Sequence, residues 1–259
     1  LRKVLIIEPT YSMPRILAES MMLEVDKALL KPVTYDLDID YIIKVGNSYD
    51  VIYICNPNNP TGNLFDMKSV ESILSHVKSL VIVDEAYAEF ARHSLINLIR
   101  DYDNLAVVRT FSKAWGLAGL RVGYIVASDT VINGLNRLSL PHNIPYPSMA
   151  LVLRALELRD YVERSIDEMV KVREYLIKSL RDLDLEPLPS VTNFVTFHAG
   201  GRKRADDLYY ELFRRRFVIR NLSGKVLCED CLRATVPPMP IAIELISALE
   251  EAFKALGGG

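Results

Sequence analysis

The sequence predicts an α/β protein, with a large domain built on a mostly parallel β-sheet and a smaller C-terminal α+β domain. Short apolar runs alternate with amphipathic helical stretches, and polar or turn-forming residues follow directly after several of the runs. The chain has 259 residues and is 50% hydrophobic, which suits one large core and one smaller core. We expect the large domain over residues 1–145, an interdomain helix over 146–183 and the small domain over 184–259.

The predicted strands of the large domain are short runs rich in Val, Ile and Leu. They are Val4–Ile7, Pro32–Tyr35, Val51–Cys55, Leu80–Val83, Ala106–Val108 and Val122–Val126. Helical patterns separate most of these runs, as over Met67–Val77 and Asp129–Leu138. Strands that alternate with helices are typical of a parallel sheet, and we expect the first apolar run to lie inside it.

The second half of the chain opens on a long helical pattern from Ser148 to Leu183, in which a kink near Arg159 is expected. A mixed segment follows it. Its predicted strands lie near Asn193–Phe197, Val218–Arg220 and Arg233–Val236, and its predicted helices cover Ala205–Arg215 and Ile241–Leu256.

Composition and charge exclude several classes of protein. The net charge is −2 with both signs mixed, so no nucleic-acid partner is predicted. No apolar run reaches the ~18 residues of a membrane span, and the first residues show no signal-peptide pattern. Three cysteines without a disulfide framework indicate a reducing compartment, so we predict a cytoplasmic protein.

Cys228 and Cys231 have the CxxC spacing of metal and redox sites. No second cysteine pair accompanies them, so we expect incidental cysteines and no metal site, with zinc or redox use as the alternative.

The candidate for covalent chemistry is Lys113, which follows the predicted strand Ala106–Val108. Hydroxyls flank it at Thr110 and Ser112, and a guanidinium follows at Arg121. Together these groups would hold a phosphate beside an amine, as an aldehyde cofactor with a phosphate tail requires. The alternative is a surface lysine whose stem lies on apolar neighbours.

Two more predicted strands end in polar residues. Asn56–Gly62 follows Val51–Cys55, and Asp84–Tyr87 follows Leu80–Val83. The carboxyl ends of parallel strands are where an open sheet binds ligands. Taken singly, such residues are more often turns or helix caps.

In these blocks the sequence resembles the fold-type-I, pyridoxal-phosphate-dependent aminotransferases of class I/II, and most of all the histidinol-phosphate aminotransferases. The matching blocks appear in the family's order and span nearly the whole chain. They are PTYSM (Pro9–Met13), NPNNPTG (Asn56–Gly62), VDEAY (Val83–Tyr87), TFSKAWGLAGLRVGY (Thr110–Tyr124), VIRN (Val218–Asn221) and LRATV (Leu232–Val236).

The resemblance implies a catalytic set of Lys113, Asp84 and Tyr87. Lys113 would form the Schiff base with pyridoxal 5′-phosphate and move the substrate proton. Asp84 would face the pyridine nitrogen, and an ion pair there would lower the pKa of this carboxyl. Asn59 and Tyr87 would bind the phenolic oxygen of the ring, and Tyr11 would lie over the ring face.

The remaining implied contacts are to anions. Thr110, Ser112 and Arg121 would bind the cofactor phosphate. Arg233 would bind the substrate carboxylate through two parallel hydrogen bonds, and Arg220 would bind the substrate phosphate. The alternative for Arg220 is a structural pair with Glu229 or Asp230.

The resemblance further implies a homodimer that moves an amino group between a phosphorylated amine, such as histidinol phosphate, and 2-oxoglutarate or glutamate. The alternatives are a threonine-phosphate decarboxylase, a broad aromatic aminotransferase, and a truncated non-catalytic homologue that binds cofactor poorly. The last stays open because the family's N-terminal part is expected to be missing. Pro14 and Pro237 also depart from the family pattern, which leaves the substrate more open than the reaction type.

Overall fold

The computed structural model describes residues 2–256, which divide into two compact units. The first unit combines the chain up to Asn59 with Leu64–Glu163, and the second combines Pro60–Asn63 with the chain from Arg164 onward. The chain therefore leaves the first unit at Pro60 and returns to it after Asn63.

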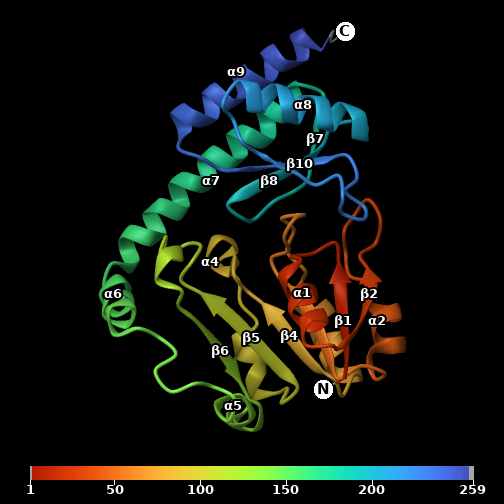
Figure 1. Ribbon diagram of the computed structural model, residues 1–259, viewed down its shortest axis with the longest axis vertical. Helices are drawn as coiled ribbons and strands as arrows, with labels where there is room; N and C mark the ends of the chain where they lie inside the picture. Colours follow the sequence, from red (N-terminus) through yellow and green to blue (C-terminus); the bar gives the residue numbers. More distant parts are fainter. Residues whose placement is uncertain (1, 257–259) are drawn as a thin grey trace. The chain divides into compact units, whose positions relative to one another are not determined.

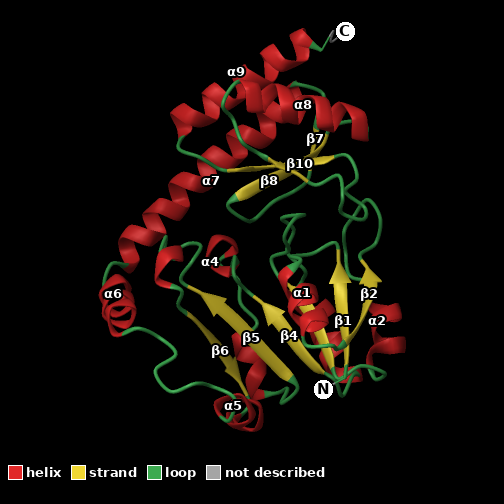
Figure 2. Ribbon diagram, in the orientation of Figure 1, coloured by secondary structure: helices red, strands yellow, loops and turns green. Residues whose placement is uncertain are grey.

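The first unit is built on a six-stranded sheet in the order β2-β1-β3-β4-β5-β6. Every neighbouring pair from β2 to β5 is parallel, and β6 pairs with β5 antiparallel. The arrows of β1, β2, β4 and β5 accordingly point to one edge of the sheet, while β6 points the other way (Figure 2). The strands are β1 (Lys3–Glu8), β2 (Glu24–Leu29), β3 (Val51–Cys55), β4 (Leu80–Asp84), β5 (Leu105–Thr110) and β6 (Gly123–Ala127).

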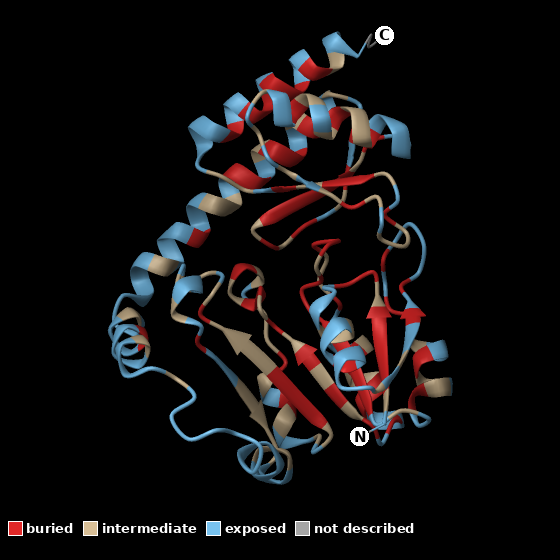
Figure 3. Ribbon diagram, viewed as in Figure 1, coloured by how far each residue is buried: buried red, intermediate tan, exposed pale blue. Residues whose placement is uncertain are grey.

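Apolar side chains bury the centre of this sheet on both faces. Val4 and Ile6 pack against Ala18 of the first helix, and Leu5 and Ile52, whose side chains alternate with those, are fully buried as well. Burial of both faces is typical of parallel strands covered by helices, and Figure 3 shows the buried strands. The helices of this unit are α1 (Met13–Ser20), α2 (Ile39–Gly46), α3 (Met67–His76), α4 (Ala88–Ala91), η1 (Ile96–Arg100), η2 (Ala118–Leu120), α5 (Asp129–Asn136) and α6 (Tyr146–Leu156).

The second unit holds a four-stranded sheet in the order β7-β8-β10-β9, with antiparallel neighbours. Helices α8, α9 and the second half of α7 cover one face of it (Figure 1). Leu176, Leu208 and Leu249, one from each helix, share a core with Phe197 of β8. The elements are α7 (Arg159–Asp182), β7 (Glu186–Pro187), β8 (Phe194–His198), α8 (Arg202–Arg214), β9 (Arg220–Asn221), β10 (Cys231–Thr235) and α9 (Met239–Ala255).

The α/β class with a mostly parallel sheet is confirmed, as is the interior position of β1. The prediction of a strand at Pro32–Tyr35 is wrong, because this segment forms turns. A strand that lies before this segment, β2 (Glu24–Leu29), was missed: its sequence EVDKAL is largely polar, and its pairing with β1 makes it a strand. The long helical pattern is broken rather than kinked, since α6 ends at Leu156 and α7 begins at Arg159.

The expectation of two incidental cysteines in the CxxC sequence is also wrong. Cys228 and Cys231 form a disulfide. The turn between them brings the two residues together, because the backbone N–H of Cys231 donates to the carbonyl oxygen of Cys228 at 3.1 Å. Sequence spacing alone does not decide between a disulfide and two thiols.

Helices that could cross a bilayer are absent from residues 2–256: none is both long and apolar enough.

Gly62 sits where a side chain does not fit. Its φ is +83°, and a Cβ atom there would lie 2.7 Å from Oγ and 2.9 Å from Cβ of Ser190. Ser190 cannot easily move, because its hydroxyl donates to the carbonyl oxygen of Phe194 at 2.6 Å. We expect Gly62→Ala to lower the free energy of unfolding by about 2–4 kcal/mol, measured by urea titration.

The control for this prediction is Gly134→Ala in helix α5, where the added Cβ would meet no atom within 4 Å beyond its chain neighbours and the adjacent backbone of its own helix. Alanine in a helix interior should raise stability by roughly 0.5–1 kcal/mol. Equal stability changes in the two variants would contradict the assigned clash.

Candidate active site

One pocket of the first unit lies at the carboxyl edge of its parallel sheet, with a cavity volume of about 260 Å³. Residues that follow four different strands line it, together with one that precedes β6. Eight of the ten residues predicted from the sequence are among them: Tyr11, Asn59, Asp84, Tyr87, Thr110, Ser112, Lys113 and Arg121. The structure thus brings these eight together, and the ligand each one contacts stays a prediction.

Asp84 is the last residue of β4, and two hydrogen bonds fix its carboxylate. Tyr53 of β3 donates its hydroxyl to Oδ2 at 2.7 Å, and the backbone N–H of Ala86 donates to Oδ1 at 3.0 Å. Burial raises the pKa of Asp84 above its ordinary value, and the bonds from Tyr53 and Ala86 and the charge of Lys113 oppose this only in part. In the chain by itself, the pKa of Asp84 is therefore shifted upward, because the loss of hydration dominates. This is opposite to the downward shift expected for Asp84 in an ion pair with the ring nitrogen.

The loop after β3 is held by its asparagines. The buried Asn56 donates its side-chain amide to the carbonyl oxygen of Phe65 at 3.1 Å and accepts from the Phe65 N–H at 2.8 Å. Asn58 donates to the carbonyl oxygen of Pro9 at 2.9 Å, which ties the loop to the chain that follows β1. Asn59 in turn donates to the Tyr87 hydroxyl at 3.3 Å. The two side chains predicted to share one ligand oxygen thus already contact each other.

The loop after β5 carries Lys113. The backbone N–H of Ser112 donates to Oγ1 of Thr110 at 3.0 Å, and the N–H of Gly116 donates to the carbonyl oxygen of Lys113 at 3.0 Å. Nζ of Lys113 lies 5.4 Å from the centre of the Tyr87 ring, within the range of a cation–π contact. The lysine side chain is exposed, so its amine borders an open pocket rather than a closed core.

Arg121 lies at the same pocket because the chain reverses direction between β5 and β6. Thr110, the last residue of β5, pairs with Gly123, the first residue of β6, so Arg121 lies just before that pair. Its backbone has a φ of +56°, and its guanidinium donates to the carbonyl oxygen of Ala118 at 3.0 Å.

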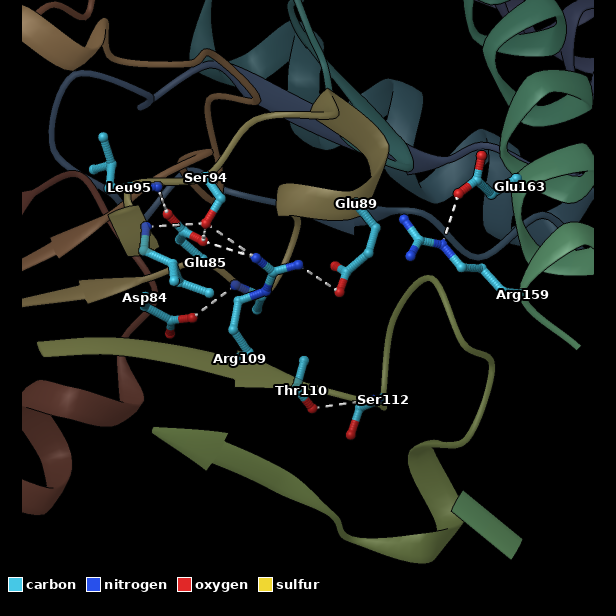
Figure 4. Close-up of polar contacts among 12 residues, drawn as sticks. Asp84, Glu85, Glu89, Ser94, Leu95, Arg109, Thr110, Ser112, Arg159 and Glu163 are labelled. Atoms are coloured by element: carbon cyan, nitrogen blue, oxygen red, sulfur yellow. Dashed lines mark hydrogen bonds and ion pairs between the residues drawn. The ribbon is translucent and has the colours of Figure 1, made fainter. Parts of the chain in front are cut away.

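Beside the predicted residues, Arg109, Glu85 and Glu89 form a largely buried ionic cluster (Figure 4). Arg109 of β5 lines the pocket and donates to Glu85 at 3.0 Å and to Glu89 at 2.8 Å. Burial raises the pKa of Glu85, against the backbone N–H of Leu95, the Ser94 hydroxyl and Arg109. This cluster connects β5 to the segment that follows β4.

Arg220 and Arg233 lie in the second unit as direct neighbours on antiparallel strands, since their Cα atoms are register partners. Side chains of such a pair stand on the same face of a sheet, and two like charges there repel. The guanidinium of Arg233 also lies 4.8 Å from the centre of the Phe194 ring. The alternative pairing of Arg220 with Glu229 or Asp230 is not observed in the described part of the chain: Asp230 binds His198 at 2.7 Å, and Glu229 accepts from the backbone N–H of Leu227 at 3.2 Å.

The sequence carries no signal for Arg109 or Cys55 as pocket residues, nor for Tyr53 as the partner of Asp84. A tyrosine in a buried strand needs a hydrogen-bond partner, which was the available hint for Tyr53. Its partner follows only from the register of β3 against β4, in which Cys55 lies opposite Asp84.

An α/β fold with a polar pocket at the carboxyl ends of its strands defines a ligand-binding or enzymatic class of protein. The family model of aminotransferase class I and II matches residues 2–243, and the chain belongs to this family. The family predicted from the sequence blocks is confirmed.

The chain is similar to curated histidinol-phosphate aminotransferases. It is 36% identical to that of Flavobacterium psychrophilum over 252 residues, which are 95% of this chain and 71% of that protein. It is 38% identical to that of Thermoanaerobacter pseudethanolicus over 220 residues, which are 84% of this chain and 62% of that protein. The chain thus spans between 62% and 71% of the length of these two relatives.

Solved structures share the fold. The histidinol-phosphate aminotransferase of Clostridium acetobutylicum superposes with a TM-score of 0.91 at 24% identity, over 98% of this chain and 78% of that one. The Sinorhizobium meliloti enzyme, in complex with pyridoxal-5′-phosphate, gives 0.89 at 24% identity, over 98% and 71%. The L-threonine-O-3-phosphate decarboxylase of Porphyromonas gingivalis gives 0.84 at 24% identity, over 98% and 77%. These likenesses confirm the fold.

The raised pKa of Asp84 predicts how stability depends on pH. An acid whose pKa is higher in the folded chain binds more protons there than in the unfolded chain, so stability falls as pH rises above 3.8 and levels off beyond the folded pKa. Asp84→Asn removes this titration. We therefore expect the stability of the ligand-free wild type, relative to Asp84→Asn, to fall as pH rises through that window, measured by urea titration at several pH values.

A difference between the two proteins that stays constant or grows with pH would contradict the assigned direction of the shift. The subtraction removes the titration of Glu85, which both proteins share.

Proposed function

We propose that this chain carries the active site of a pyridoxal-phosphate-dependent aminotransferase that acts on a phosphorylated amine. The observation that supports this most directly is the pocket that joins an exposed lysine, a partly buried carboxylate, and hydroxyl and guanidinium donors at one sheet edge. The match to the aminotransferase family and the relatives named histidinol-phosphate aminotransferase support the same function.

The side chains of the pocket suit pyridoxal phosphate. When bound, this cofactor supplies an aldehyde that condenses with primary amines and a protonated ring that withdraws electrons from the substrate carbon. Thr110, Ser112 and Arg121 offer two hydroxyls and a cation for a phosphate, and Lys113 offers the amine. The Sinorhizobium meliloti relative, which shares the fold, contains this cofactor.

Asp84 would hold a proton on the ring nitrogen. Its carboxylate is fixed by Tyr53 and Ala86, so it can accept a hydrogen bond from that nitrogen without reorganising. A cation at this position would also offset the cost of burying the carboxylate, and so reverse the direction of its pKa shift.

Lys113 is the base in this proposal. It would take a proton from the substrate carbon and return it at another position, which a flexible amine beside the ring can do. The hydrogen bond between Asn59 and Tyr87 places their two polar groups next to each other in the pocket lining, where they would bind the ring oxygen.

The substrate assignment rests on Arg220 and Arg233. Two guanidiniums in a cross-strand pair favour a doubly anionic ligand or two anionic substrates in turn. A phosphorylated amine such as histidinol phosphate, with 2-oxoglutarate or glutamate as its partner in histidine biosynthesis, meets this requirement. The fold shared with a threonine-phosphate decarboxylase makes release of CO₂ from phosphothreonine the second candidate. The homodimer and the cytoplasmic location stay predictions.

The first test is covalent labelling of Lys113. We expect the chain incubated with pyridoxal phosphate to gain a visible absorption band, and borohydride reduction to leave a pyridoxyl group on Lys113 in peptide maps. Lys113→Ala should lose the label, and its transamination rate should fall by ~10²–10⁴-fold or more.

Lys78→Ala, an exposed lysine outside the pocket, is the matched control and should keep both label and rate. Labelling of another lysine in the wild type would refute the role of Lys113.

The second test separates the two arginines. Arg220→Ala should lower kcat/KM for histidinol phosphate by about 2–4 kcal/mol of transition-state free energy, because the substrate phosphate loses its cation. Arg233→Ala should instead lower kcat/KM for glutamate, which loses the bidentate contact to its α-carboxylate. Steady-state kinetics in both directions of the reaction measure these effects.

Arg202→Ala, at the exposed start of α8, controls for the loss of one positive charge from the second unit. Full activity of Arg220→Ala on histidinol phosphate would exclude the phosphorylated-amine assignment and favour a broad aminotransferase. Faster CO₂ release from phosphothreonine than amino transfer in the wild type would favour the decarboxylase.

A further inference from the structure

The second unit contains a cluster of metal-ligating side chains that the aminotransferase chemistry does not use. Cys231, which is bonded to Cys228, lies beside His198 and Asp230. Donor atoms of His198, Asp230 and Cys231 all lie within 4.8 Å of one another.

The sheet itself brings this cluster together. His198 of β8 and Cys231 of β10 are register partners on antiparallel strands, so their side chains share one face. Sγ of Cys231 lies 3.7 Å from Nδ1 and 3.9 Å from Nε2 of the His198 ring. The turn that precedes β10 adds Cys228, whose Cα lies 4.9 Å from that of Cys231.

Asp230 fixes the orientation of the imidazole. Its Oδ1 lies 2.7 Å from Nδ1 of His198, and its Oδ2 accepts from the backbone N–H of Gly201 at 3.2 Å. A carboxylate on one ring nitrogen orients the imidazole and fixes its tautomer, as it does around histidines that bind zinc.

We propose that, when the disulfide is reduced, Cys228, Cys231 and His198 bind a thiophilic divalent cation such as Zn²⁺, with Asp230 as the positioning residue for His198. The disulfide and the metal-bound form exclude each other, because both use the same two sulfur atoms. The site is thus a redox-dependent metal site, separate from the pocket of the first unit.

The distances suit zinc. Zn–S bonds of about 2.3 Å and Zn–N bonds of about 2.0–2.1 Å place a sulfur and a nitrogen about 3.6 Å apart on a tetrahedral ion. The observed separation of 3.9 Å between Sγ of Cys231 and Nε2 of His198 is close to this value, and because Sγ also lies 3.7 Å from Nδ1, the imidazole must turn for Nε2 to face the ion. Three protein ligands leave a fourth position for water.

The chemistry balances with a phosphine as reductant. The phosphine supplies two electrons to the sulfur–sulfur bond and becomes a phosphine oxide with oxygen from water, and each sulfur gains a proton. Binding of Zn²⁺ to the two thiols then releases those two protons, so that the metal affinity falls at lower pH.

The cluster is open on one side and closed on the other. Both cysteines are fully buried, whereas the side chains of His198 and Asp230 are 25% and 24% exposed. A cation would therefore enter past the imidazole. The turn that it would fix joins β9 to β10, the two strands that carry Arg220 and Arg233.

The test uses the whole 259-residue chain with Co²⁺ as the probe. We expect the chain reduced with a phosphine, but not the oxidised chain, to bind one Co²⁺ with a thiolate-to-cobalt absorption band in the near ultraviolet. One equivalent of Zn²⁺ should displace the cobalt and raise the Tm of the reduced chain only. A reduced wild type that gives no thiolate band, so that the disulfide is only a structural crosslink, overturns the proposal.

Four substitutions locate the ligands. Cys228→Ser and His198→Gln should each abolish the band or weaken binding by at least ~10-fold, and Asp230→Asn should weaken binding by roughly 10–100-fold while the band persists. Cys55→Ser and His76→Gln, which change a cysteine and a histidine outside the cluster, should bind cobalt like the wild type. An unchanged band in Cys228→Ser or His198→Gln overturns the assigned ligands, and circular dichroism checks that each variant is folded.

Discussion

The edge at which the parallel strands end is the constraint on which the rest of the first unit depends. Strands β1, β3, β4 and β5 all leave the sheet there, and the antiparallel β6 begins there, so five distant parts of the sequence meet without long connections. The turns must then be fixed by local hydrogen bonds. Asn56 and Asn58 hold the loop after β3, and Asp84 itself accepts the Ala86 N–H. The hydrogen bonds that end the strands at this edge therefore also fix the geometry of the site.

The sequence predicted this edge well, because buried parallel strands and their polar ends leave local signals. Val51–Cys55 is buried, as its apolar run indicated, and Asn59, which follows this strand, lines the pocket. Strand β2 left no such signal. Only its penultimate residue, Ala28, is buried, and its Glu, Asp and Lys side chains suit an edge strand that depends on its neighbour. Local hydrophobicity cannot predict a strand whose stability comes from pairing.

Contacts between side chains on neighbouring strands were the second feature that could not be predicted from the sequence. The hydroxyl of Tyr53 reaches Asp84 across 31 positions of sequence, and Arg109 joins Glu85 across 24. His198 lies beside Cys231 only because β8 pairs with β10 in one particular register. A one-residue slip would turn either side chain to the opposite face. The residue types were visible in the sequence, and their partners were not.

Two arrangements of charged side chains destabilise the chain by itself. In each case the proposed ligand group carries the opposite charge. Burial raises the pKa of Asp84, which means that the ionised carboxylate destabilises the ligand-free chain. The cross-strand neighbours Arg220 and Arg233 place two positive charges side by side, which a sheet would otherwise avoid. A protonated ring nitrogen would relieve the first cost and a phosphate or carboxylate the second. These two costs support binding as the role of Asp84 and of the arginine pair, since active sites commonly sacrifice stability for function.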